Sequence, residues 1–360
     1  MKLNRQLEQE QASYVNHSYL IDCSLGSNPF GCPDISPEAT HSFIEGIDQY
    51  YSFHHYAEIA YLTSCYLGVD SRHLTFTNGS LGALELIFNK LIDSRSRSMI
   101  GIGPQFVEGV SEFIQIGGHY QAIDMFRYPC EHSLFAALEA KVQKEKPSLV
   151  YIDNPNNPTG RIYDKSHLIS LCQVCEKAGS VLIVDEAYGE FLQPEQSMSS
   201  ETLWYSNLLV LRSFSKGLGL AGVRLGYILS SPKLTPFVQS AVTVFAPSLP
   251  ALKIACHILP KAQAFVAENL VNTERFKKQM VKLCKQCGFD VVPSSDHTPI
   301  MLLHMPMIDV AKRLEELNIR TCSGEHFSIT CQQVDEQYAR VRIVGNERDL
   351  DQIRLRLESL

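Results

Sequence analysis

A lysine, two serines and an arginine lie close together in the stretch SFSKGLGLAGVRLGY, at residues 213–227. The segment before it, NLLVLR, is mostly apolar and is typical of a buried strand. The chain therefore places an ammonium group, two hydroxyls and a guanidinium at the end of a core strand. Hydroxyls and a guanidinium bind a phosphate well, and a lysine beside them can act as a nucleophile or as a base.

Three other segments place polar groups where elements end or begin. VDEAY has Asp185 at the end of an apolar run, NPNNPTG forms a turn at residues 154–160, and TNGSLGALELI begins a helix near Gly79. Each has an ordinary explanation by itself, as a helix cap, a turn or a glycine-rich helix start. Together they supply a base, an anion site and a carboxylate for a cationic ring nitrogen, which is the set that pyridoxal phosphate (PLP) needs.

The elements that must position these groups alternate along the middle of the chain. Strand-like runs occupy residues 98–103, 148–155, 181–187 and 207–215, and helical patterns lie between them at residues 106–118, 133–146 and 165–179. The alternation predicts βαβ units and an α/β fold with a doubly wound, mostly parallel sheet. Ligands of such sheets bind beyond the carboxyl ends of the strands, which is where the polar groups lie.

The pattern changes near residues 243–254, where a long helical stretch begins that runs to about Gly288. Two strand-like runs and two helical patterns follow it. We therefore expect a turn-rich N-terminal arm over residues 1–35, a large PLP-binding domain over 36–245 and a smaller α+β C-terminal domain over 246–360.

Composition and charge exclude several classes of function. The 360 residues carry a formal net charge of −7, without a block of lysine and arginine, which argues against nucleic-acid and membrane partners. The N-terminal segment is polar and lacks the apolar core of a signal peptide, so we expect a cytoplasmic protein whose eleven cysteines are reduced thiols. The CxxC pairs Cys172/Cys175 and Cys284/Cys287 lie in helical patterns without further ligands, so we predict buried cysteines and no metal site.

The motifs NPNNPTG, VDEAY and SFSKGLGLAGVRLGY, in this order and at this spacing, resemble those of the fold type I PLP-dependent aminotransferases of class I and II. Within that family, the chain is most similar to the branch of histidinol-phosphate aminotransferase and threonine-phosphate decarboxylase. The resemblance runs from SLGSNPFG to VRIVGNERD, which is nearly the whole chain. It implies an aspartate aminotransferase-like fold and an aminotransferase that acts on an amino acid or amino-alcohol phosphate through a Lys216 Schiff base.

The resemblance also implies roles around the cofactor. Lys216 matches the Schiff-base lysine, Asp185 the partner of the pyridine nitrogen, and Arg224 a ligand of the phosphate. Tyr188 and Asn157 match donors to the phenolic oxygen of the ring. The other implied cofactor contacts are Ser213, Ser215, Gly79, Ser80 and Leu81 at the phosphate and Phe106 stacked on the ring.

Substrate contacts are implied in the same way. Arg342, in VRIVG, matches the arginine that grips the substrate α-carboxylate with its planar fork, together with Asn157. Asn28 lies where the N-terminal arm closes over the substrate, and Arg320 matches an arginine that holds a phosphate on the substrate tail. Arg161, directly after NPTG, is a second candidate for the tail.

Tyr51 aligns with a tyrosine that family members send across a dimer interface to the cofactor phosphate of the neighbouring subunit. The segment QYYSFHHY also holds Tyr50 and Tyr56, and either could take that role instead. The resemblance thus implies a homodimer with a shared active site.

Three functions remain open at this point. The first is an aminotransferase that uses glutamate and 2-oxoglutarate as its second pair. The second is a decarboxylase of an O-phospho amino acid, because the cofactor can also break the bond to a carboxylate that stands perpendicular to the ring. The third is a non-catalytic PLP-fold protein, which the presence of Lys216, Asp185 and Arg224 disfavours. The segment at residues 321–341 is longer than we expect in either branch, which leaves the tail pocket and the substrate open.

Overall fold

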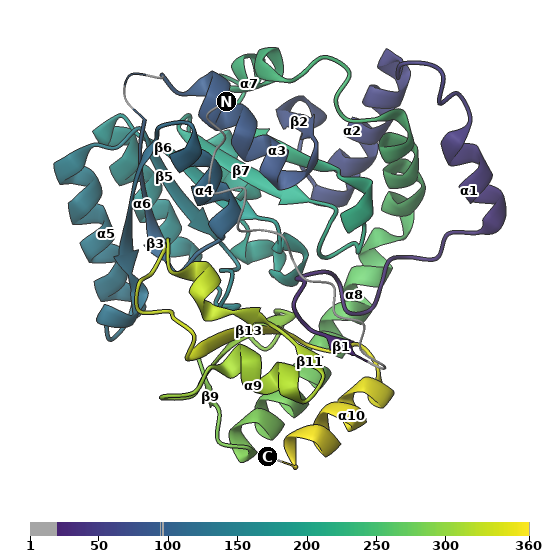
Figure 1. Ribbon diagram of the computed structural model, residues 1–360. Helices are drawn as coiled ribbons and strands as arrows, with labels where there is room; N and C mark the ends of the chain where they lie inside the picture. The colour runs from purple at the N-terminus through teal and green to yellow at the C-terminus, as the bar shows by residue number, and fades with distance from the viewer. Residues whose placement is uncertain (1–19, 94, 96, 360) are drawn as a thin grey trace, which may run out of the picture.

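The computed structural model describes residues 20–93, 95 and 97–359 of the chain (Figure 1). The first 19 residues of the predicted N-terminal arm lie outside the described residues. A seven-stranded sheet with helices on both faces forms the larger part of the molecule, and a smaller group of strands and helices lies below it in Figure 1.

The large sheet is mixed, with the strand order β2-β8-β7-β6-β5-β3-β4. Its strands are β2 (Leu74–Thr77), β3 (Ser98–Gly103), β4 (His119–Asp124), β5 (Leu149–Asp153), β6 (Val181–Glu186), β7 (Leu208–Ser213) and β8 (Gly226–Ser230). β8 runs antiparallel to both of its neighbours, whereas the other neighbouring pairs are parallel. The predicted α/β fold is confirmed, and the four predicted strands are β3, β5, β6 and β7.

The helices that cover this sheet form two groups. One face carries α2 (Phe53–Leu67), α5 (Glu131–Glu145) and α6 (Lys165–Ala178), and the other carries α3 (Gly79–Leu86), α4 (Val107–Gln115) and α7 (Thr235–Ala241). Side chains alternate along each strand. Val184 and Val210 therefore pack with the α5 and α6 group, whereas their neighbours Ile183 and Leu211 pack with the α3 and α4 group. The same alternation decides which way each residue at a strand end points.

Helix α8 (Leu249–Gln286) joins the two parts of the molecule as one helix of 38 residues (Figure 1). It begins at a cap, because the side chain of Ser248 accepts a hydrogen bond from the amide of Ala251. Its first half packs into the core of the large part through residues such as Leu252, and its second half packs into a separate core through Phe276. The long helical stretch predicted from the sequence is thus confirmed.

The smaller part is built around a four-stranded sheet with the order β12-β13-β10-β9. Its elements are β9 (Asp290–Val291), β10 (Ile300–His304), α9 (Val310–Glu316), β12 (Cys322–Ser323), β13 (Tyr338–Arg342) and α10 (Glu347–Leu357). Beside it, β1 (Ile21–Asp22) pairs in parallel with β11 (Ile319–Arg320), so the described end of the arm joins this part. Two separate cores suit two domains, and the boundary near residue 245 stays a prediction.

Helix α1 (Pro37–Ile44) lies at the outer edge of the molecule beside α8. Cys172 and Cys175 in α6 and Cys284 in α8 are buried, as predicted, and Cys287 is half-buried. Among the described residues, no helix combines the length and the apolar character that a membrane span requires. The cytoplasmic location stays a prediction.

Candidate active site

The loops after β6 and β7 bring a lysine, a tyrosine and the N-terminal arm together. The Nζ atom of Lys216 lies 5.5 Å from the centroid of the Tyr188 ring. The hydroxyl of Tyr188 donates a hydrogen bond to the carbonyl of Gly26 in the arm, at 3.2 Å. A Cβ atom on Gly26 would lie only 2.0 Å from Tyr188 Oη and 3.4 Å from Lys216 Nζ, so the arm passes directly over the lysine and requires glycine there.

Asp185 lies at the end of β6 and is buried. Its Oδ2 accepts a hydrogen bond from the hydroxyl of Tyr151 at 3.0 Å, and its Oδ1 accepts one from the amide of Ala187 at 2.9 Å. Burial raises the pKa of Asp185 to about 6, and these two hydrogen bonds together with the charge of Lys216 limit the rise. A buried carboxylate held in this way suits a cationic ring nitrogen. Sequence analysis missed Tyr151, which is an inward residue of an apolar strand.

A guanidinium, two hydroxyls and a helix N-terminus meet after β7. Arg224 Nη1 donates to Ser215 Oγ at 3.4 Å and to the carbonyl of Ala221 at 3.1 Å, and Ser213 Oγ accepts from the amide of Ser215 at 3.1 Å. Arg224 also lies against the first residue of α3, since a Cβ atom on Gly79 would be 2.8 Å from Arg224 Nη2. Gly79 has a φ of 75°, which glycine adopts without strain. Ser80 and Leu81 follow in the first turn of α3 and are half-buried.

A second buried carboxylate, Asp153 at the end of β5, orders the loops on the other side of the site. Its Oδ2 accepts from the amide of Asn157 at 2.9 Å and from the amide of Phe106 at 3.1 Å. Burial raises the pKa of Asp153 to about 7, while these hydrogen bonds and one from the Asn156 side chain lower it. Asp153 thus holds Phe106 and Asn157 in fixed positions. The final Asp of LVYID was available in the sequence as a signal for this role.

Arg340, which sequence analysis missed, is the arginine beside Asn157. Its Nη1 donates to Asn157 Oδ1 at 2.9 Å and its Nη2 to the carbonyl of Ser24 at 2.5 Å. The predicted residue Arg342 instead donates from Nη2 to the carbonyl of Asp22, also at 2.5 Å. Ala339, before the two arginines, and Val341, between them, both pack into the small core. Arg340 and Arg342 therefore lie together on the other face of β13. Of the two arginines, Arg340 is the one that contacts Asn157.

The two arginines predicted for the substrate tail lie in different surroundings. Arg320 is the residue of β11 that pairs with Asp22, and its neighbour Ile319 packs into the small core, so Arg320 faces away from that core. Arg161 forms an ion pair with Glu131 at 3.3 Å and lies 5.7 Å from the centroid of the Tyr163 ring. Arg161 thus already has an anionic partner in Glu131.

Asn28 is buried and holds the arm to the lysine loop. Its Nδ2 donates to the carbonyl of Gly217 at 2.8 Å, and its Oδ1 accepts from the amide of Phe30 at 2.9 Å. Both ends of the amide are therefore used within the chain. This arrangement supports a role for Asn28 in closing the arm over the site.

The three tyrosines of QYYSFHHY differ in their hydrogen bonds and in their exposure. Tyr51 donates its hydroxyl to the carbonyl of Ala246 at 3.2 Å, and the Tyr56 hydroxyl accepts from the amide of Phe76 at 3.4 Å. Tyr50 is 75% exposed and stacks on Phe245, with 4.0 Å between the ring centroids. Tyr51 and Tyr56 are both half-buried and pack against the core of the large part, whereas Tyr50 is exposed.

The long segment after β11 docks on the loop that carries Phe106. Thr330 Oγ1 accepts from the amide of Gln105 at 3.3 Å, and His326 Nε2 lies 3.3 Å from Glu108 Oε1. A Cβ atom on Gly103 would lie 1.9 Å from the carbonyl oxygen of Thr330, so the contact is close. The extra residues noted in the sequence therefore form one wall beside Phe106.

These groups fit PLP. The guanidinium of Arg224, the serine hydroxyls and the glycine-led start of α3 converge as an anion site should, and the approach of Arg224 to Gly79 leaves no room for a side chain there. Asp185 offers a buried carboxylate to a cationic ring, and it is close enough to Lys216 for the charge of that residue to lower its pKa. Among the described residues, no cluster of three or more metal-ligating side chains was found.

Comparisons with known proteins agree with this arrangement. Residues 25–357 match the family described as aminotransferase class I and II. The chain is 30% identical over 321 residues to histidinol-phosphate aminotransferase 1 of Bacillus thuringiensis subsp. konkukian (strain 97-27), which covers 87% of this chain and 83% of that protein.

Two solved structures share the fold. One is histidinol-phosphate aminotransferase from Sinorhizobium meliloti in complex with pyridoxal-5'-phosphate, with a TM-score of 0.80 and 18% identity over 94% of this chain and 91% of that one. The other is L-threonine-O-3-phosphate decarboxylase from Porphyromonas gingivalis, with a TM-score of 0.76 and 21% identity over 94% of this chain and 99% of that one.

Proposed function

Because the chain belongs to the class I and II aminotransferase family, we propose that it is a histidinol-phosphate aminotransferase-like enzyme. It would move the amino group of an amino acid or amino-alcohol phosphate to a 2-oxo acid with the help of PLP. The observation that carries this proposal is that Lys216 acts on the buried carboxylate of Asp185 and directly follows Ser215, which contacts Arg224.

The cofactor would be held by groups from four loops. When bound, PLP supplies an electron-withdrawing ring that acidifies the α-carbon of an attached amino acid. Asp185 would pair with the ring nitrogen, Asn157 and Tyr188 would hold the phenolic oxygen, and Phe106 would cover the ring. The phosphate would be bound by Ser213, Ser215, Arg224 and the amides of Gly79, Ser80 and Leu81.

Lys216 and Tyr188 would carry the proton chemistry. Lys216 Nζ lies close to the arm at Gly26, and its amine would take a proton from the α-carbon of a bound amino acid and hold it for return. The hydroxyl of Tyr188 is oriented by its hydrogen bond to Gly26. The arm passes close to the lysine and would limit the access of water to it, which would strengthen electrostatic contacts within the site.

Arg340 is our candidate for the substrate α-carboxylate, in place of Arg342. Its guanidinium contacts Asn157, whereas that of Arg342 contacts the carbonyl of Asp22. The Nε atoms of both arginines are buried without a hydrogen-bond partner among the described residues. A carboxylate beside it would gain a paired contact in a partly buried site. Arg340→Ala should raise KM about 10- to 100-fold for every amino acid substrate, as expected for loss of charged hydrogen bonds. A larger effect from Arg342→Ala would return the role to Arg342.

Arg320 is our candidate for a phosphate on the substrate tail. It shares with Arg340 and Arg342 the direction away from the small core, so three cations line this side of the smaller part. The Arg320→Ala enzyme should lose activity on histidinol phosphate and keep its activity on an unphosphorylated amino acid. Equal losses on both substrates would contradict a tail role.

Decarboxylation is the second candidate, favoured by the likeness to the threonine-phosphate decarboxylase fold and by a second arginine so close to Arg340. The test is to follow the visible absorbance of the PLP-loaded protein after an amino acid is added. Loss of the band without CO₂ marks an aminotransferase, and stoichiometric CO₂ marks a decarboxylase. Protein that gains no visible band with excess PLP would contradict both.

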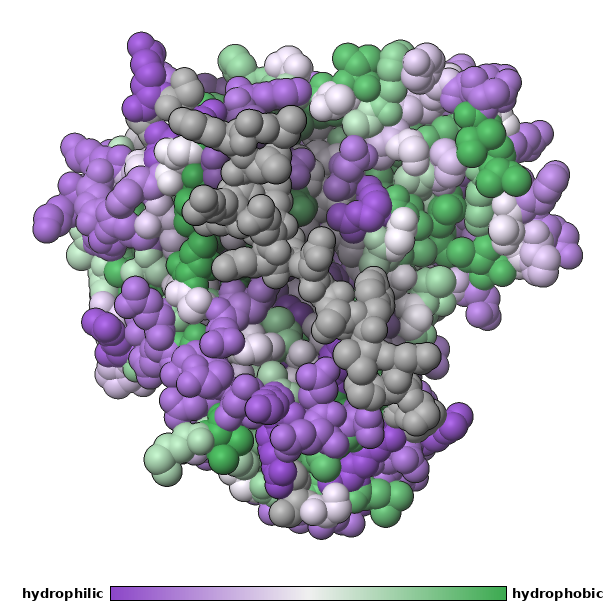
Figure 2. All heavy atoms as spheres, in the orientation of Figure 1, coloured by the Kyte–Doolittle hydropathy of each residue, from purple (hydrophilic) through white to green (hydrophobic). Residues whose placement is uncertain are grey.

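We also propose a homodimer with shared sites. Large apolar side chains are exposed around α1 and the start of α2, and Figure 2 shows apolar residues on that side of the molecule. The exposed residues are Ile44, Ile47, Tyr50, Phe53, Val244 and Phe245. A partner on this surface would bury an apolar patch that is costly in water. It would also bring its Tyr51, or the more exposed Tyr50, near the phosphate site.

A subunit-mixing experiment tests this arrangement. Lys216→Ala and Tyr51→Phe subunits, each impaired alone, should form mixed dimers in which one of the two sites is intact. Recovery of activity on mixing supports a shared site, and Tyr50→Phe serves as the matched alternative. A monomer by sedimentation equilibrium would contradict the proposal.

A further inference from the structure

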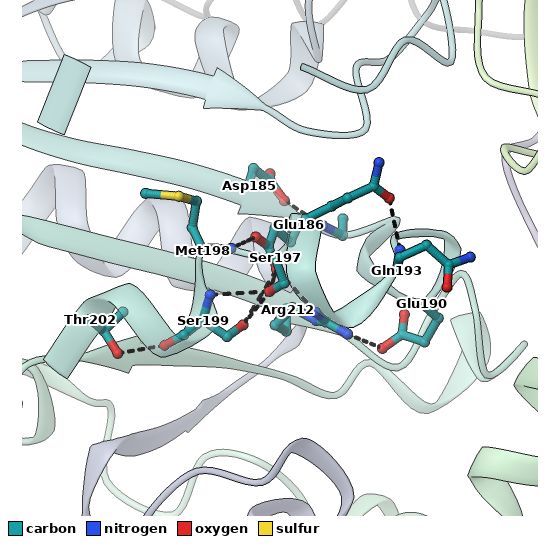
Figure 3. A network of polar contacts seen from close by, with 11 residues as sticks. Asp185, Glu186, Glu190, Gln193, Ser197, Met198, Ser199, Thr202 and Arg212 are labelled. Atoms are coloured by element: carbon teal, nitrogen blue, oxygen red, sulfur yellow. Dashed lines mark hydrogen bonds and ion pairs between the residues drawn. The ribbon is translucent and has the colours of Figure 1, made fainter. Parts of the chain in front are cut away.

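A buried ion cluster lies on the opposite face of the strand ends from the site. Arg212, the penultimate residue of β7, donates from Nη1 to Glu186 Oε2 at 3.0 Å and from Nη2 to Glu190 Oε1 at 2.9 Å (Figure 3). The side chains of Arg212, Glu186 and Glu190 are 6%, 0% and 2% exposed. We call these three residues the buried triad. Glu186 is also fixed by the Ser197 hydroxyl and the Met198 amide, each at 2.6 Å.

The triad sets two carboxyl groups against one guanidinium. Burial acts to lower the pKa of Arg212, but the nearby Glu190, Tyr227 and Glu186 hold it well above its usual range, so Arg212 is a cation. Two carboxylates share this one guanidinium. Glu190 Oε2 is buried and has no hydrogen-bond partner among the described residues. A buried carboxyl oxygen without a hydrogen-bond partner costs free energy. The triad is therefore not explained by its contribution to stability alone.

Glu190 lies directly beneath the residue that follows Lys216. A Cβ atom on Gly217 would be 2.1 Å from Glu190 Cβ and 2.7 Å from Glu190 Oε2. From the other side, Asn28 Nδ2 donates to the Gly217 carbonyl at 2.8 Å. The main chain next to Lys216 is therefore clamped between Glu190 and the N-terminal arm.

Arg212 fixes the other end of the same turn. It directly precedes Ser213, whose side chain points to the opposite face of the sheet and accepts from the Ser215 amide at 3.1 Å. A Cβ atom on Gly189, which precedes Glu190, would lie 2.5 Å from Arg212 Cζ, so the two loops are in close contact. The turn from Ser213 to Gly217 thus rests on the triad at both ends.

We propose that Glu190 and Arg212 are positioning residues for Lys216, and that they set where its amine meets the aldehyde of the cofactor. This inference rests on the proposed function. In the step concerned, the nitrogen of Lys216 replaces the aldehyde oxygen of PLP, and that oxygen leaves as water with the two amine protons. A misplacement of about 1 Å at such a reacting atom can lower the rate of the reaction about a hundredfold. Binding of the phosphate and the ring needs no such bond.

The experiment compares two forms of the cofactor. PLP carries the aldehyde, whereas pyridoxamine phosphate has the same ring and phosphate but an amine in its place, so it forms no bond to Lys216. Glu190→Ala removes the support beneath Gly217. It should weaken PLP binding by about tenfold or more, measured by equilibrium dialysis, and leave the affinity for pyridoxamine phosphate nearly unchanged. Glu190→Gln keeps the shape and one acceptor for Arg212, and it should restore most of the preference for PLP.

A purely structural role would behave differently. It would weaken both cofactor forms in parallel, and that result, or an unchanged ratio, would overturn the proposal. Leu138→Ala, in the core of the same sheet face, is the matched control, since it should lower the thermal midpoint without changing the ratio of the two affinities.

A second variant decides the matter if Glu190→Ala does not fold. Gly217 is not among the glycines with positive φ, so Gly217→Ala tests the contact with Glu190 without backbone strain. It should reduce the PLP preference in the same way, and an unchanged ratio would again overturn the proposal. Wild-type protein that forms no visible band with PLP would instead contradict the proposed function itself.

Discussion

The two faces of the sheet at the ends of β6 and β7 use adjacent residues for opposite purposes. On one face, Asp185 and Ser213 lie beside Lys216 in the candidate site. On the other face, Glu186 and Arg212 pair with each other in a closed, buried cluster. Asp185 and Glu186 are consecutive residues, and so are Arg212 and Ser213. Because side chains alternate along a strand, the two members of each pair point to opposite faces. Chemistry and its support are thus encoded at consecutive positions.

We call the face with Asp185 and Ser213 the front face and the face with Glu186 and Arg212 the back face. Variants on the front face should lose function and keep stability, whereas variants on the back face should lose stability first. Lys216→Ala is the sharpest test on the front face. It should abolish the visible PLP band and the borohydride-fixed adduct, because no other amine is proposed to join the cofactor. The measurement is the absorbance spectrum with mass analysis of the reduced protein. An unchanged circular dichroism spectrum is expected, and full turnover would contradict the role of Lys216.

Two arginines separate the faces most directly. Arg212→Met strands two buried carboxylates and should lower the free energy of unfolding by about 3–5 kcal/mol. Arg224→Met, on the exposed front side, should change it by about 0.5 kcal/mol in the cofactor-free protein. Urea unfolding of the cofactor-free variants gives both values. Similar losses from the two variants would remove the distinction.

The pH dependence of cofactor binding reports on the front face alone. The pKa of Asp185 is about 6 in the cofactor-free protein, so the carboxyl takes up a proton as the pH falls through 6 and no longer pairs with a cationic ring. PLP affinity should therefore fall towards acid pH, by up to about tenfold per pH unit below 6. Asp185→Asn has no proton to lose, so the part of the slope due to Asp185 should vanish in that variant.

Tyr151→Phe should give the smallest effect. It removes the hydroxyl that donates to Asp185, so the pKa of Asp185 should rise further above its ordinary value. Loss of one hydrogen bond to a charged group corresponds to about 1.5 kcal/mol. The acid limb of the PLP affinity profile should shift to higher pH. A profile that matches the wild type would show that the amide of Ala187 suffices.

The sequence predicted most of what lies at the strand ends and less of what crosses between elements. Lys216, Asp185 and Arg224 stand in motifs that follow apolar runs, and the structure brings them to one edge. Tyr151 belongs to an apolar strand, where a polar partner across the sheet leaves no local pattern. The buried triad was missed for a similar reason, since Arg212 lies on another strand than the segment that carries Glu186 and Glu190.

The choice between Arg340 and Arg342 shows another limit. The two residues share one face of β13, so periodicity treats them alike. Only the distance across to Asn157 separates them, and that distance depends on how the small sheet meets the large one. The direction of β8 and the docking of Thr330 on Gln105 are likewise long-range outcomes that local residue patterns do not specify.

The N-terminal arm contributes main-chain oxygens to three side chains around the site: the carbonyls of Asp22, Ser24 and Gly26 accept from Arg342, Arg340 and Tyr188. These acceptors are main-chain atoms, so they are present whatever residues occupy positions 22 and 24. Asp22 also accepts hydrogen bonds from the amide and the hydroxyl of Ser24, so a substitution at 22 should matter more than one at 24. Inserting or deleting a single residue between 22 and 26 would change the spacing of the three carbonyls. The length of the arm segment from residue 22 to residue 26 is therefore more constrained than its amino-acid sequence.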